Sequence, residues 1–480
     1  MRGPVGARFI APWLRGRWRW LLIAAVVAGA GIGGVLVYRD AASKHHARGW
    51  KRKLPPYTVE LPAANGWDLY VQAAELARQV PPFELLESLK FVDAVATEDS
   101  ESIAAYQPTA ETAIERGRPA LDLLRQARNL PCAHAPPDRD DRQADMAAFE
   151  VMKDCRGLAR LESIHMSLAH LNGADTEVLD AVEDTLALGV GFASSGRQFD
   201  AFAGATILRI GAYHGTLILG GGLHATRERL LQHASSVRDI HRRQCPLARI
   251  VHYECDDSLY ILEHIGPLYD QGAAEAEARG NAAQAEDSRR ERDIMQRLAP
   301  DLFAYVDTWS LEAVAEGSRP LWEMDLSGLM ARGRAEVQHI GTRDGASEAP
   351  EVLRWVLPSL ERDPDMWKES MPADAPEPSS FLDRLRRFDA ALSAEEVAGL
   401  LAAYRVDRGE YPLTLDGLVP GYTDAIPLDP WTGKSILYRR EGPTDYVLYC
   451  AGPDRVDGGG EGDPWRVGTP DYVLIRPRTP

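Results

Sequence analysis

The sequence predicts a mainly α fold, a helical bundle or irregular α-solenoid that follows one N-terminal transmembrane helix and precedes a small C-terminal α+β domain. Three observations lead to this prediction. One long segment near the amino end carries no charge, apolar residues recur at helical spacing through the middle of the chain, and strand-like runs are confined to its carboxyl-terminal part. The 480 residues are 45% apolar, which is enough to bury several cores and excludes collagen-like and disordered chains.

The uncharged segment is Trp20–Tyr38. Its 19 residues, at ~1.5 Å per helical residue, just span a hydrocarbon core of ~30 Å. Basic residues follow Tyr38 at once, unlike a signal-peptide cleavage region, so we expect an uncleaved, single-pass membrane anchor. Ala25, Gly29 and Gly33 repeat a small residue every four positions. They are either ordinary small residues of a membrane helix or a face through which two copies pair as a homodimer.

Charge is divided unevenly along the chain. Residues 1–53 hold eleven Lys or Arg and one acid, Asp40, a formal charge of +10, so the remaining residues carry −27 within the total of −17. A body this acidic repels phosphate backbones, which argues against nucleic acid as a partner.

Helical periodicity begins after Asn65, which we expect to cap the first helix, and continues to about Leu360. One buried face is marked by residues three and four positions apart: Leu158, Leu161, His165, Leu168 and Leu171. Five prolines between positions 358 and 380 predict a linker. The predicted division is a basic N-terminal segment (1–19), the transmembrane helix (20–38), a basic and proline-containing stalk (39–64), a helical domain (65–357), the linker (358–380) and a C-terminal domain (381–480).

The five cysteines allow three interpretations. If the body lies outside the cytoplasm, sequence neighbours suggest the disulfides Cys132–Cys155 and Cys245–Cys255, with Cys450 left free. Alternatively, His241, Cys245, His252 and Cys255 carry zinc-type ligands at H-x₃-C-x₆-H-x₂-C spacing, although this spacing differs from that of common zinc fingers. In the third interpretation Cys245 and Cys255 are unpaired structural thiols.

The C-terminal domain combines a helix with strands. Ser393 and Glu396 form a capping box, which predicts a helix that begins there and ends near Gly409. Runs at 435–440 and 446–451 are separated by a Gly-Pro turn and predict a hairpin, and a last short strand is expected at 472–475.

The order of features in this domain resembles the globular head of the major pseudopilin of type II secretion systems. The resemblance rests on Tyr411-Pro412 after the helix, Asp429-Pro430-Trp431, the tyrosine-rich hairpin, Gly452-Pro453-Asp454 and the glycine- and acid-rich run at 458–463. It covers about 85 residues. Filament assembly is not carried over, because in that family the apolar helix runs directly into the head, whereas here more than 350 residues separate them.

The resemblance implies calcium as a cofactor, since the acidic loop of that family binds this ion. The matching residues here are Asp454, Asp457 and Asp463, and their carboxylates are the hard oxygen ligands that calcium prefers. The alternative is an acidic, glycine-rich turn without an ion.

The sequence therefore predicts a membrane-anchored extracytoplasmic protein, non-enzymatic, whose helical body binds protein partners of the cell envelope and whose C-terminal module is pseudopilin-like. One alternative is an accessory component of a type II secretion or pilus-like system. A second is a metal-dependent hydrolase that uses His241, Cys245, His252 and the adjacent acids Glu254, Asp256 and Asp257. The sequence contains no G-x-S-x-G, Walker or H-E-x-x-H motif, so it carries no catalytic residue that such motifs would mark.

Basic residues flank the anchor on both sides, so charge does not decide its orientation. The cysteines and the C-terminal domain favour a body in the periplasm, with the chain crossing the inner membrane once. A reporter enzyme that is active only outside the cytoplasm, fused after Pro480, should therefore be active. A cytoplasm-only reporter at the same position serves as the control, and its activity would contradict both the orientation and the two predicted disulfides.

Overall fold

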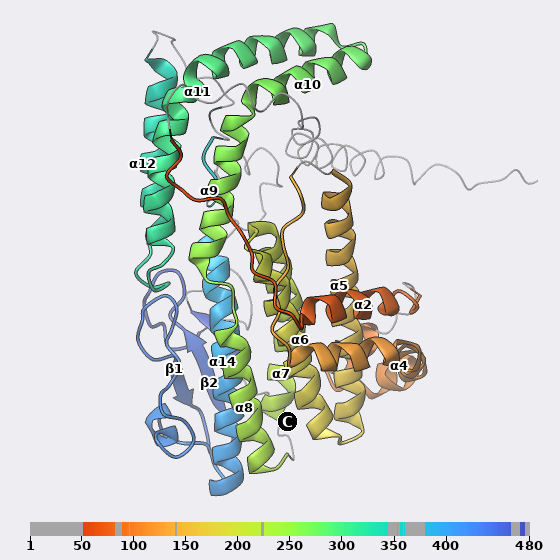
Figure 1. Ribbon diagram of the computed structural model, residues 1–480. Coiled ribbons are helices and arrows are strands. Elements are labelled where there is room, and N and C mark those ends of the chain that lie inside the picture. The colour runs from red at the N-terminus through yellow and green to blue at the C-terminus, as the bar shows by residue number, and fades with distance from the viewer. Residues whose placement is uncertain are drawn as a thin grey trace, which may run out of the picture.

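Helices make up most of the computed structural model (Figure 1). The residues described are 51–81, 89–95, 97–139, 142–221, 225–343, 353, 356–358, 360, 380–461 and 471–475. The first group of helices comprises α2 (Gly66–Ala77), α4 (Ser100–Arg128), α5 (Arg142–Leu171), α6 (Asp175–Phe192) and α7 (Gln198–Gly221). As expected, the Asn65 side chain caps α2 by accepting a hydrogen bond from the Trp67 backbone N–H.

Helices α6 and α7 approach each other most closely at two glycines. A Cβ atom at Gly204 would lie 2.3 Å from the carbonyl oxygen of Gly189, and a Cβ at Gly189 would lie 2.8 Å from that of Gly204. Only glycine leaves room for this approach. The resulting pair forms the centre on which α2, α4 and α5 pack around one apolar core.

The second group comprises α9 (Leu247–Glu263), α10 (Ile265–Ala278), α11 (Ala282–Glu316) and α12 (Leu326–Thr342). Helices α9, α11 and α12 enclose a second apolar core, whereas α10 and the first half of α11 pair with each other as an arm that projects from the body in Figure 1. Helix α8 (Arg227–Arg242) links the two groups and lies beside α6 and α14.

The C-terminal part consists of α14 (Phe381–Arg408), a short 3-10 helix (Leu415–Leu418) and a three-stranded antiparallel sheet in the order β1 (Leu437–Arg440), β2 (Tyr446–Cys450), β3 (Tyr472–Ile475). The hairpin, the last strand and the helix end are confirmed; Gly409 caps α14 with φ of 76°. The predicted helix start is wrong. Ser380 caps α14, and Ser393 is buried thirteen residues further on, in the helix interior, where the supposed capping box points into the protein.

Helix α14 is buried on almost every side, because α7 and α8 pack on one side of it and the sheet on the other. One apolar core runs from α6 and α8 through α14 to Trp431, Leu448 and Leu474. The amino end of α14 enters the second core with Phe381 and Leu385. The sheet and the helical body are thus parts of one packed unit.

The described part of the predicted stalk, residues 51–64, lies against the body as an extended strap that crosses α9 in Figure 1. Leu54 is buried in the second core, and its backbone N–H donates to Asp307 of α11. His252 of α9 bonds the carbonyl oxygen of Pro55, and the Tyr57 hydroxyl donates to the carbonyl oxygen of Ser195. The strap ties the two helix groups together.

The predicted fold class needs correction. The structure is mostly helical with a small three-stranded sheet, and the sheet shares its core with the helices instead of forming a separate α+β domain. None of the helices in the described ranges combines the length and apolar composition needed to cross a bilayer. The predicted transmembrane helix, Trp20–Tyr38, lies outside the described residues, as does most of the predicted linker.

Candidate functional site

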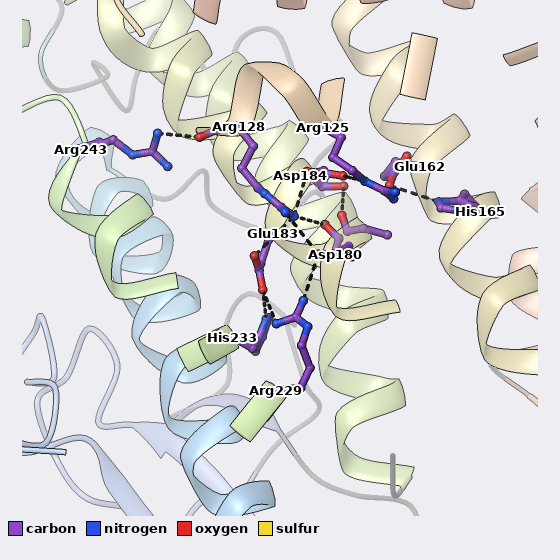
Figure 2. Close-up of polar contacts among 12 residues, drawn as sticks. Arg125, Arg128, Glu162, His165, Asp180, Glu183, Asp184, Arg229, His233 and Arg243 are labelled. Carbon is purple, nitrogen blue, oxygen red and sulfur yellow. Dashed lines mark hydrogen bonds and ion pairs between the residues drawn. The ribbon is translucent and has the colours of Figure 1, made fainter. Parts of the chain in front are cut away.

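Five helices bring charged side chains together inside the body, in a buried charge network (Figure 2). Its members are Arg125 and Arg128 of α4, Glu162 and His165 of α5, Asp180, Glu183 and Asp184 of α6, Arg229 and His233 of α8, and Glu395 of α14. The three acids of α6 are spaced three and four residues apart, which places them on one face of the helix. Buried charges are costly unless they are paired, so this concentration is the feature of the body that most requires explanation.

Two arginines connect the acids of α6. Arg128 lies 3.2 Å from Asp180 and 3.0 Å from Asp184, and Arg229 lies 3.1 Å from Asp180 and 3.0 Å from Glu183. The charges of His233, Arg229 and Arg128 outweigh the effect of burial and lower the pKa of Glu183. Glu183 is therefore ionised in the folded protein and binds α6 to α4 and α8.

His233 joins this group to the C-terminal helix. Its Nδ1 lies 3.0 Å from Glu183 and its Nε2 lies 3.7 Å from Glu395, an ion-pair distance that is too long for a hydrogen bond. Burial opposes protonation of His233, but the two carboxylates outweigh burial and raise its pKa. Burial raises the pKa of Glu395, and His233 offsets only part of this effect. Neither carboxylate oxygen of Glu395 has a hydrogen-bond partner among the residues that the structure describes.

The far end of the network is rich in acid. Asp184 lies 3.5 Å from Arg125, and its pKa is raised well above the ordinary value by burial and then by the charge of Glu162. Glu162 in turn lies 3.3 Å from Nδ1 of His165, and it raises the pKa of that histidine against the effect of burial. Five carboxylates thus face three arginines, and the two histidines supply the missing positive charge when they are protonated.

A cavity of about 390 Å³ adjoins the network, and Arg128, Glu183, Ser236 and Arg243 are among the residues that line it. Arg243 donates to the carbonyl oxygens of Arg128 and Leu130, which ties the end of α8 to the end of α4. The network contains no nucleophile beside a base. Its ion pairs hold five helices together and make their packing depend on the protonation of two histidines.

The predicted disulfides are absent from the structure. All five are free thiols, so neither Cys132–Cys155 nor Cys245–Cys255 is formed. Burial raises the pKa of Cys245 to about 11 and those of Cys132 and Cys255 to about 12. Thiols with such pKa values are protonated at neutral pH and are poor nucleophiles and metal ligands.

The four residues of the predicted zinc set do not converge. His241 lies 2.7 Å from Asp389, His252 bonds Pro55 of the strap, and Cys245 contacts the carbonyl oxygen of Pro246. Cys255 is buried in the second core. Within the described ranges, no three His, Cys, Asp or Glu side chains are close enough to hold a metal ion.

Two of the three predicted calcium ligands are described, and both are exposed; Asp463 lies outside the described residues. Asp454 accepts from the backbone N–H of Val456, and Asp457 accepts from the Tyr449 hydroxyl and the N–H of Gly459. The sequence analysis did not identify the buried acid that organises this loop, Asp471. Asp471 at the start of β3 is buried and accepts from the N–H groups of Gly458, Gly460 and Glu461.

The glycine-rich loop covers the second face of the sheet. A Cβ at Gly460, where φ is 74°, would lie 2.9 Å from the ring of Tyr449 and 3.0 Å from Val447. Close approach to the sheet thus explains this glycine without an ion.

A Ser–His–Asp set also lies in the body. Nδ1 of His134 is 3.2 Å from Ser194, and Nε2 is 3.4 Å from Asp200. The nitrogens are exchanged relative to a hydrolase triad, in which the carboxylate holds Nδ1 and the serine faces Nε2. All three residues are buried, and Trp67 stacks on the imidazole at 3.8 Å. This set is a structural contact between the loop before α5 and the corner between α6 and α7.

Sequence reasoning found His165 but missed the rest of the network. A signal was present, because Asp180, Glu183 and Asp184 alternate with Val178, Val182 and Leu186 in a helix with apolar residues on its buried face. Comparison of the chain with protein-family models, curated proteins and solved structures gives no match.

The network makes stability depend on pH. His233 binds its proton more tightly in the folded protein than at its ordinary pKa of 6.5, so its contribution is complete below that pH and is lost as pH rises through the folded value. The raised pKa of Glu395 acts in the same direction above 4.5. Urea unfolding of Glu395→Gln between pH 5 and 8 should show a free energy of unfolding that falls less steeply with pH than that of the wild type. The difference in slope should be up to ~1.4 kcal/mol per pH unit for each proton no longer bound on folding.

Glu228→Gln, an exposed change on α8, is the matched control and should keep the wild-type slope. Equal slopes for Glu395→Gln and the wild type would show that this carboxylate does not couple to folding.

Calcium binding by the acidic loop remains a prediction, which can be tested on the full-length protein. Saturating calcium at ~100 times Kd should raise the free energy of unfolding by about 2.7 kcal/mol, because the ion binds only the folded loop. Thermal melts with calcium and with chelator measure this rise. Asp454→Ala should abolish it and Asp424→Ala, another exposed aspartate of the same region, should not. A melting temperature that does not change with calcium would show that the loop is held by its hydrogen bonds to Asp454, Asp457 and Asp471 without an ion.

Proposed function

We propose that this chain is a non-enzymatic protein of the cell envelope, held at the inner membrane by its apolar N-terminal segment, whose body and pseudopilin-like C-terminal module bind another envelope protein. An accessory role in a type II secretion or pilus-like system is the narrower form of this proposal. The observation that carries it is the common core of α14, α8 and the sheet, which presents the C-terminal module in one fixed orientation on a helical support.

The motifs behind the pseudopilin resemblance have structural roles that support the proposal. Asp429 accepts hydrogen bonds from the backbone N–H groups of Trp431 and Ala451, and so joins the turn before β1 to the end of β2. Trp431 is fully buried and donates through Nε1 to Asp383 of α14. The Asp-Pro-Trp motif therefore fastens the sheet to α14, which keeps the C-terminal module in a fixed position for binding another protein.

The burial of α14 also limits how such a module can act. Its residues between Phe388 and Leu401 are committed to α7, α8 and the sheet, so they offer no free face to a second copy of the chain. We therefore assign partner binding to the connection between α14 and β1, residues 409–436. That connection exposes Leu413, Val419 and Leu428 by 80%, 38% and 41%. Exposed apolar side chains supply the contact area of a protein-binding surface where they lie together.

A photo-crosslinking amino acid at position 413 should join the chain to one discrete envelope protein in intact cells, because Leu413 is the most exposed of these residues. Leu413→Asp should then weaken binding of that purified protein at least tenfold, as expected when an anchoring apolar contact is replaced by a charge. Leu311→Asp, at an exposed site on α11, is the matched control and should bind normally. Equal affinity for the two variants, or no crosslink at 413, would overturn the proposal.

A further inference from the structure

A second cavity lies where α8, α9, α14 and the segment between α11 and α12 meet. Its volume is about 630 Å³, within the range of small-molecule sites. Residues from three separate stretches of the chain (238–248, 317–324 and 385–389) line it, so the site exists only in the folded protein. It lies outside the charge network and contains none of the residues assigned above to partner binding.

Most of the cavity wall is apolar. Leu247 of α9, Leu321 and Met324 before α12, and Leu385 of α14 belong to this wall, with Pro246 and Pro320 at its edges. Met324 and Leu385 are part of the second core or adjoin it, which makes this side of the cavity rigid. A surface of this composition accepts an alkyl chain and excludes a fully polar ligand.

The polar lining carries positive charge on an otherwise acidic protein. Three arginines and one carboxylate line the cavity, whereas the whole chain carries −17. Arg238 is held by Glu396 and Thr423, and His241 is held by Asp389, so the lining residues Arg238, His241 and Asp389 all have polar partners. Burial lowers the pKa of His241, but the hydrogen bond and charge of Asp389 outweigh burial, so the pKa is raised overall. The protonated histidine and the carboxylate then form an ion pair with no net charge.

The two remaining arginines are at the cavity surface and can turn toward a ligand. The Arg242 side chain is 71% exposed and pairs with Asp239, and the Arg319 side chain is 48% exposed and pairs with Glu316 and Glu323. Exposed ion pairs of this kind contribute little to stability, so either guanidinium can exchange its partner for a bound anion at small cost. The amino end of α9 faces the same space, and Pro246 at its N-cap has no side-chain acceptor for the first N–H groups.

We propose that this cavity binds a single-chain anionic amphiphile of the fatty-acid class, with the alkyl chain against Leu247, Leu321 and Leu385 and the carboxylate between Arg242 and Arg319. The apolar wall supplies the affinity for the chain, and the arginines supply the preference for an anionic head group. This activity is independent of partner binding by the C-terminal module.

Isothermal titration of the full chain with decanoate tests the proposal. Decanoate should bind with one-site saturation, and the double variant Arg242→Ala/Arg319→Ala should raise Kd at least tenfold because two charge-assisted contacts are lost. Arg290→Ala, at an exposed and ion-paired arginine of α11, is the matched control and should leave Kd unchanged. Both substitutions lie at exposed sites, so the fold is expected to tolerate them.

Two further titrations examine the two halves of the ligand. Decan-1-ol has the same chain without the charge, and acetate has the charge without the chain; each should bind at least tenfold more weakly than decanoate. Acetate that binds as well as decanoate would mark a simple anion site and overturn the amphiphile assignment. Decanoate that fails to bind, or binds the double variant as well as the wild type, would overturn the site itself, whatever the outcome of crosslinking at Leu413.

Discussion

The burial of α14 is the constraint on which the rest of the structure depends. This helix is covered by α7 and α8 on one side and by the sheet on the other, and it carries residues of two apolar cores along its length. Its buried side chains include Leu385, Phe388, Leu392, Val397 and Leu401, and leaving this apolar surface in water would be unfavourable. The body and the C-terminal module therefore enclose it together, and neither is complete without the other.

The charge network joins α14 to the helices that enclose it. Glu183 contacts Arg128, Arg229 and His233, and His233 reaches Glu395 on α14. Burying these charges costs free energy that apolar residues of similar volume would not cost, so the network is weak evidence for stability. Removing one partner, in contrast, leaves the other buried and uncompensated, typically at a cost of about 3–5 kcal/mol. The network thus selects one arrangement of the helices and penalises the others.

Buried aspartates perform a related task in the C-terminal module. Asp429 and Asp471 are both fully buried, and each accepts several backbone N–H groups from segments that form no regular structure. Buried backbone groups outside helices and sheets need such acceptors, since an unpaired N–H is costly in a core. In this way the three-stranded sheet gains the turns and the glycine loop that close its outer face.

Local signals in the sequence determined the elements that depend on local physics. Asn65 caps α2 because its side chain reaches an N–H two residues away, and Gly409 ends α14 because only glycine adopts a positive φ without strain. The Gly-Pro turn between two strand-like runs likewise predicted the hairpin. The capping box at Ser393 had the correct residue types, but long-range packing extended α14 thirteen residues beyond it toward the amino end, since that segment is buried against the second core. Only the tertiary structure brought the acids of α6 to arginines on α4 and α8, laid the strap across α9 and merged the sheet with the body. These contacts join residues far apart along the chain, and no periodicity or spacing within one segment specifies which surface another segment will meet.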